Sequence, residues 1–133
     1  MQHRRVFKTK TFDRWAKKLV PDALLCLAAS EIERGLFEAD LGQGVCKKRI
    51  ALPGRGKSGS TRALVAKQHR AALFFIAGRG KSDVGTDFSR REEEAAKLYA
   101  GMLHKVSEER FELMLVDGAL KEIRNGDEVE RKK

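Results

Sequence analysis

Ten basic side chains between Leu41 and Ser82 are the residues in this sequence best suited to chemistry on a polyanion. They are Lys47, Lys48, Arg49, Arg55, Lys57, Arg62, Lys67, Arg70, Arg79 and Lys81. The segment contains no Asp or Glu. The whole chain has 28 basic and 19 acidic residues, so 18 basic residues stand against 19 acidic ones outside the segment. The segment therefore carries the whole net charge of +9, which predicts a phosphate backbone as its partner.

Basic side chains of this kind could support RNA cleavage without a metal ion. Attack by a ribose 2′-OH needs a base, an acid for the leaving oxygen and stabilisation of the phosphorane charge. Clustered cations lower the pKa of a lysine, which could then exchange protons, whereas arginine only stabilises charge. His3, His69 and His104 all fall outside the interior of the basic strands, so a paired-histidine mechanism is not expected. The segment has no carboxylate ligands, so we expect neither a metal nor another cofactor.

A glycine-basic motif occurs twice in the segment. Gly54-Arg55-Gly56-Lys57-Ser58 is repeated as Gly78-Arg79-Gly80-Lys81-Ser82. Glycine lets a backbone approach a ligand closely, and the neighbouring Arg and Lys supply charge. A P-loop is excluded, because its first glycine would fall on Ala51 or Leu73. The alternative is that both copies are solvated turns between strands.

The length and hydropathy of the chain indicate one domain without a membrane anchor. We expect the domain to span 1–123 and the polar tail 124–133 to be disordered. No apolar run approaches the eighteen or so residues that a membrane span needs, and no secretory signal follows Met1. Cys26 and Cys46 lack metal-binding spacing and are expected to be small core residues. These features favour a cytoplasmic protein.

Periodicity and turn residues predict an α+β fold with the order β-αα-βββ-αα. The expected elements are a strand at 6–11, helices at 12–19 and 21–35, strands at 45–52, 61–68 and 71–77, and helices that follow Ser89 and Ser107. Short connections favour a twisted antiparallel sheet with helices packed on it. Ser89 stands three residues before Glu92, which is the spacing of a capping box. We expect Trp15 to serve in core packing.

Alternation along the first basic strand divides its side chains between two faces. Val45, Lys47 and Arg49 fall on one face, and Cys46, Lys48 and Ile50 fall on the other. The basic side chains of such a sheet, together with those of the glycine-basic loops, suit a phosphate backbone. The RNA-binding candidates are Lys48, Arg55, Lys67 and Arg79.

Several blocks of the sequence resemble the RelE/ParE toxin superfamily, and most closely the HigB-type toxins of bacterial toxin–antitoxin pairs. The blocks are Lys47-Lys48-Arg49-Ile50, Pro53 to Gly59, Arg62 with Leu64 to Ala66, Phe75, and Gly78 with Lys81. The likeness also includes Phe12-x-x-Trp15, Glu31-Ile32-Glu33-x-Gly35 and Gly118-x-Leu120, and it extends to about Ile123. Two blocks depart from the family pattern. Ser60-Thr61-Arg62 replaces Gly-aromatic-Arg, and Arg79-Gly80 replaces an apolar-aromatic pair.

The resemblance implies a microbial-ribonuclease-like fold and metal-independent cleavage of mRNA on the ribosome. It also implies a cognate antitoxin, often a helix-turn-helix protein. By motif position Arg62 matches the family's sheet arginine, which contacts the scissile phosphate. The other catalytic candidates that it implies are Lys47, Arg49 and Lys57, one of them a possible general base, and Lys81 after the last strand. Two alternatives stay open: a gyrase-poisoning toxin of the same superfamily, and a nucleic-acid-binding module without catalysis.

Overall fold

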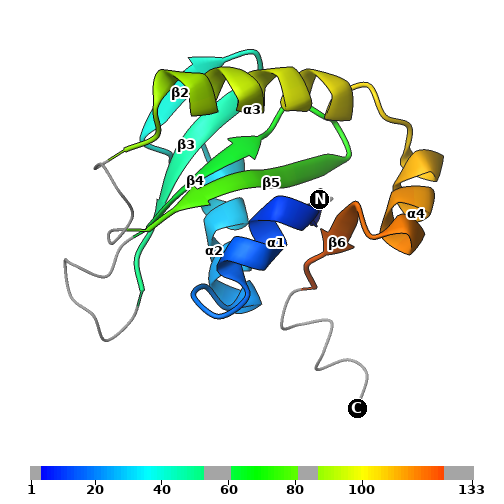
Figure 1. Ribbon diagram of the computed structural model, residues 1–133, viewed down its shortest axis with the longest axis horizontal. Coiled ribbons are helices and arrows are strands. Elements are labelled where there is room, and N and C mark those ends of the chain that lie inside the picture. Colours follow the sequence, from blue (N-terminus) through cyan, green and yellow to red (C-terminus); the bar gives the residue numbers. More distant parts are fainter. Residues whose placement is uncertain (1–3, 53–60, 81–86, 125–133) are drawn as a thin grey trace.

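The computed structural model describes residues 4–52, 61–80 and 87–124, and these form an α+β domain (Figure 1). Its elements are β1 (Arg5–Thr9), α1 (Lys10–Ala16), α2 (Asp22–Glu33), β2 (Ala39–Gly42), β3 (Val45–Ile50), β4 (Thr61–Ala66), β5 (Ala72–Arg79), α3 (Arg90–Leu103), α4 (Glu108–Asp117) and β6 (Leu120–Glu122). The predicted fold class is confirmed. Arg55, Lys57, Lys81 and the tail 125–133 lie outside the described residues, as does the whole of the first glycine-basic motif.

The six strands form one sheet in the order β2-β3-β4-β5-β1-β6. The expected antiparallel meander is present, because β3 pairs with β4 and β4 with β5 in antiparallel register. The sheet is mixed, however, since β1 lies parallel to β5. The long connection from β1 to β5 brings the chain back in the same direction, which a short hairpin cannot do. Two short strands, β2 and β6, were not predicted, and they extend the sheet at its two edges.

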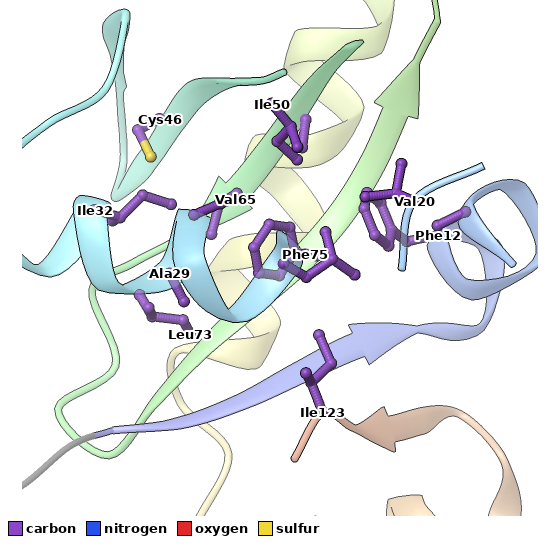
Figure 2. Close-up of a cluster of buried hydrophobic side chains, with 14 residues drawn as sticks. Phe12, Val20, Ala29, Ile32, Cys46, Ile50, Val65, Leu73, Phe75 and Ile123 are labelled. Carbon is purple, nitrogen blue, oxygen red and sulfur yellow. The ribbon is translucent and has the colours of Figure 1, made fainter. Parts of the chain in front are cut away.

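Helices cover both faces of the sheet. In Figure 1, α3 lies on one side of the strands, and α1 and α2 lie on the other. Cys46 and Ile50 of β3 join the buried cluster beneath α1 and α2, which Figure 2 shows in close-up. Val45 of the same strand belongs to the cluster beneath α3 and α4. The predicted division of β3 between two faces is therefore confirmed.

Local capping residues fix where the helices begin and end. The capping box of α3 forms as predicted, with the Glu92 N–H donating to Ser89 Oγ and the Ser89 N–H donating to Glu92 Oε1. Ser107 caps α4, which ends at Gly118 with φ at +87°. The first helix begins earlier than predicted, because Thr9 Oγ1 accepts the Phe12 N–H and makes Thr9 the N-cap. None of the helices in the described ranges is long and apolar enough to cross a membrane.

Gly78, in the second glycine-basic motif, packs against Trp15. A Cβ atom at position 78 would lie 2.2 Å from both Cε3 and Cζ3 of the indole ring. Trp15 itself packs on the cluster beneath α1 and α2, as predicted, and its ring lies 5.4 Å from that of Phe12. The close approach that this glycine permits is therefore to a side chain of the core.

The buried position of Cys46 predicts a slow reaction with thiol reagents. The side chain is fully buried, and this burial is the main cause that raises its pKa to about 12. At pH 8 only about one part in ten thousand of such a thiol is thiolate, the reactive form. We expect iodoacetamide to modify Cys26, which is half-buried, well before Cys46 in the native protein. Mass spectrometry of time points would measure this order, and equal rates for the two thiols without denaturant would contradict it.

Candidate nucleic-acid interface

Three arginines lie opposite one another on β3, β4 and β5, near one end of each of these strands. Arg49 of β3 is the register partner of Arg62 of β4, and Arg62 is the partner of Arg79 of β5. Residues directly opposite each other in a sheet share a face, which here is the face beneath α3. Lys47 lies on the same face, two residues before Arg49. We call Lys47, Arg49, Arg62 and Arg79 the basic row.

A β-bulge places Arg79 in the basic row. Val65 pairs with Phe75, but Leu64 pairs with Ala77, so Ile76 is an extra residue in β5. Without this extra residue, Gly78 would lie opposite Arg62, and Arg79 would point to the face covered by α1. Bulges are known to redirect side chains in this way next to functional sites. Like charges directly opposite each other destabilise a sheet, so this arrangement indicates a role other than stability.

Carboxylates from the start of α3 provide the countercharge for the basic row. Lys47 Nζ lies 2.6 Å from Asp87 Oδ2 and 3.7 Å from Glu93 Oε2. Arg79 Nη2 lies 3.1 Å from Glu92 Oε1. We call Asp87, Glu92 and Glu93 the acidic cover.

Hydrogen bonds and nearby positive charges lower the pKa of two carboxyl groups in the acidic cover, those of Asp87 and Glu92. Burial raises the pKa of Asp87, but hydrogen bonds from Lys47 and the Phe88 N–H, together with the charges of Lys47 and Arg62, lower it below its usual value. The pKa of Glu92 is also lowered, first by the Ser89 N–H and, against the effect of burial, by Arg79. Both carboxylates are therefore negatively charged wherever the protein would meet RNA.

Phe88 anchors the acidic cover to the sheet. Its side chain is buried in the cluster beneath α3, and the Arg79 guanidinium lies 5.9 Å from the centre of its ring. Phe88 stands between Asp87 and the N-cap Ser89. Its burial against the sheet therefore fixes the position of Asp87 and of the first turn of α3, which carries Glu92 and Glu93. The charge pattern did not point to these residues, because they follow the basic segment that ends at Ser82. The capping box was the available signal, because it places Glu92 in the first turn of a helix that starts shortly after β5.

Both lysines among the predicted RNA-binding residues, Lys48 and Lys67, lie away from the basic row. Lys48 is buried on the opposite face, where its Nζ lies 2.8 Å from Glu31 Oε1 of α2 and donates to the Leu36 carbonyl. Strand alternation accounts for this, because Lys48 has the opposite parity to Lys47. Lys67 follows the other end of β4 and lies 3.3 Å from Asp40 Oδ2. Of the predicted site residues that the structure describes, it brings together the four that form the basic row.

The histidines among the described residues take part in turns at the far end of β4. His69 Nε2 lies 2.7 Å from the Val106 carbonyl, and its Nδ1 accepts the Ala71 N–H. His104 Nε2 accepts the Gln68 N–H, and burial is the main cause that lowers the pKa of its imidazole. Within the described ranges, no group of three or more His, Cys, Asp or Glu side chains is placed to hold a metal ion. The chemistry that the basic row itself offers is phosphate binding and charge stabilisation.

Comparison with known proteins identifies the family. A search of curated proteins gave no match to this chain. A family model described as the RelE toxin of the RelE / RelB toxin-antitoxin system matches residues 4–123, which include every strand and helix described above. Such a toxin has an antitoxin as its partner. The chain belongs to the RelE family of toxins of toxin–antitoxin systems.

Proposed function

We propose that this protein is a HigB-type toxin that cleaves mRNA on the ribosome without a metal ion. The observation that carries the proposal is the register of Arg49, Arg62 and Arg79 across three neighbouring strands. Three guanidinium groups in line can contact successive phosphates or concentrate on one phosphate as charge develops. The protein would act in the cytoplasm, where a cognate antitoxin, of helix-turn-helix type, would neutralise it.

Each member of the basic row has a distinct part in this proposal. Arg62 lies between the other two arginines and would stabilise the charge on the scissile phosphate. Arg49 and Arg79 would bind the flanking phosphates. Lys47 occupies one of the strand positions at which the family resemblance implies a possible general base, and its part would be proton exchange with the ribose 2′-OH.

The other predicted site residues fall into two groups, those outside the described residues and those that form ion pairs away from the basic row. Arg55, Lys57 and Lys81 stay candidates for RNA contact or catalysis through their positions in the family motifs. The ion pair of Lys48 with Glu31 supports a structural role in holding α2 to the sheet. The pair of Lys67 with Asp40 supports a similar role for the turn after β4.

Induction of the wild-type chain from a tightly controlled promoter tests the proposal. We expect growth to stop and new 5′ ends to appear in cellular mRNA, in phase with the reading frame. In a reconstituted translation system, the same ends should appear on ribosome-bound mRNA and not on naked mRNA. Intact mRNA together with DNA damage would instead favour the gyrase-poisoning alternative. Normal growth with intact mRNA would favour a nucleic-acid-binding module without catalysis.

A further inference from the structure

We propose that the acidic cover is an internal brake on RNA binding, which RNA phosphates must displace from the basic row. In the free protein, Asp87 and Glu93 hold Lys47, and Glu92 holds Arg79. The proposal rests on the proposed function to the extent that RNA is the polyanion. It concerns binding and makes no assumption about cleavage.

The exposure of the paired groups shows which side of each pair faces solvent. The side chains of Lys47 and Arg79 are only 14% and 15% exposed, whereas those of Asp87 and Glu92 are 44% and 43% exposed. A ligand that approaches from solvent therefore meets the carboxylates before it meets the cations. A phosphate group would be repelled by these carboxylates unless they moved.

Exposed carboxylates also pair with covered cations elsewhere, as in Lys48 with Glu31 at 7% and 32% exposed, but two other pairs have a different arrangement. Arg5 and Glu122 join β1 to β6 at 2.8 Å, and there the carboxylate is the more covered partner, at 22% exposed against 34%. Lys8 and Asp13 are both almost fully buried, at 10% and 12%. These two pairs fasten elements together. The acidic cover combines carboxylates that are more exposed than their cations with a position over the basic row, where Arg49, Arg62 and Arg79 lie in register.

The cover also reduces the usual driving force for nucleic-acid binding. Much of that driving force comes from the release of mobile counterions when Lys and Arg neutralise phosphates. A carboxylate on the same chain is a counterion that cannot be released. Lys47 and Arg79 therefore contribute less to the affinity for RNA, and less to its salt dependence, than two cations without carboxylate partners would.

Asp87 is the member of the cover that RNA can displace most readily. It precedes the N-cap of α3, and its carboxylate accepts hydrogen bonds from Lys47 Nζ and from the Phe88 N–H. Glu92, in contrast, also accepts the Ser89 N–H in the capping box, so its displacement would weaken the start of α3. The proposal thus assigns the main brake to Asp87, with a smaller contribution from Glu93.

Binding of an RNA that cannot be cleaved tests the brake. The probe is a fluorescently labelled single-stranded oligonucleotide with 2′-O-methyl riboses, and anisotropy is measured over a series of KCl concentrations. We expect Asp87→Asn to bind about three- to tenfold more tightly than the wild type. The slope of log affinity against log salt should become steeper by about 0.7, because one more cation neutralises a phosphate. Asp117→Asn, which removes the same charge from an exposed site at the end of α4, should match the wild type.

A double-mutant cycle identifies the cation that the brake acts on. In a Lys47→Ala background, Asp87→Asn should change the affinity less than twofold, since its partner is absent. Glu93→Gln should give a smaller gain in affinity than Asp87→Asn. If thermal melting shows that Asp87→Asn does not fold, Glu93→Gln replaces it in the binding experiment.

Three outcomes would overturn the brake. The first is that folded Asp87→Asn, or Glu93→Gln if Asp87→Asn does not fold, binds the RNA no more tightly than the wild type. The second is that Asp87→Asn raises the affinity equally in the Lys47→Ala background. The third is that no variant binds the RNA at low salt. Because the probe has no free 2′-OH, cleavage is judged separately from mRNA ends. Tighter binding by Asp87→Asn together with uncut mRNA would leave the brake standing and overturn the proposed function.

Discussion

Replacement of Arg62 by alanine is expected to lower the rate of mRNA cleavage by about a thousandfold while the protein stays folded. Arg62 is the central member of the basic row, with Arg49 and Arg79 opposite it on either side. Its loss would remove stabilisation where the phosphorane charge develops, and it would also relieve repulsion between like charges in the sheet. Single-turnover cleavage of ribosome-bound mRNA would measure the rate, and thermal melting would report the fold.

Two further variants separate the role of Arg62 from a general loss of charge. Arg110→Ala removes the same charge from the exposed first turn of α4 and should leave the cleavage rate unchanged. Arg62→Lys keeps the charge but loses the planar pair of donors, so its rate should fall between those of the wild type and the alanine variant. A wild-type rate in folded Arg62→Ala would remove this residue from the proposed mechanism.

Replacement of Gly78 by alanine is expected to reduce the free energy of unfolding by about 3 kcal/mol. The new Cβ would lie 2.2 Å from two carbon atoms of the Trp15 ring, well inside van der Waals contact. The ring is rigid and packs against Phe12 and the core beneath α1, so the strand or the helix would have to shift. Urea unfolding followed by the fluorescence of Trp15, the only tryptophan, would measure the loss directly.

Gly101 provides the matched control for this substitution. It lies within α3, and a Cβ atom at this position would have no neighbour within 4 Å. Gly101→Ala should therefore stabilise the protein by about 0.5–1 kcal/mol, because alanine favours a helix more than glycine does. Equal unfolding midpoints for Gly78→Ala and the wild type would show that Trp15 can move aside at little cost.

The sequence was sufficient to predict half of the basic row. Strand alternation placed Lys47 and Arg49 on one face, but the charge distribution did not distinguish that face from the opposite one, which carries Lys48. The position of Arg79 depends on the bulge at Ile76, and an alternating pattern does not reveal where an extra residue enters a strand. The prediction that Arg62 contacts the scissile phosphate came from a family motif, and the register of Arg62 with Arg49 and Arg79 became apparent only in the folded sheet.

Long-range contacts account for what the sequence did not reveal. Lys48 has the same charge as Lys47, yet it pairs with Glu31, and this partner depends on how α2 crosses the sheet. The acidic cover lies outside the basic segment and reaches it only because Phe88 docks on the sheet. The parallel pairing of β1 with β5 likewise joins segments far apart in the chain, and no local pattern encodes it.

The position of β1 between β5 and β6 has a consequence for synthesis of the toxin on the ribosome. β1 is translated first, but its neighbours in the sheet, β5 and β6, are translated much later. A nascent chain that stops before Leu120 would leave β1 as an edge strand with unpaired backbone groups. The sheet that carries the basic row is therefore completed only after β6 has been translated, which delays the appearance of a folded toxin until the ribosome has read its mRNA past the codon for Glu122.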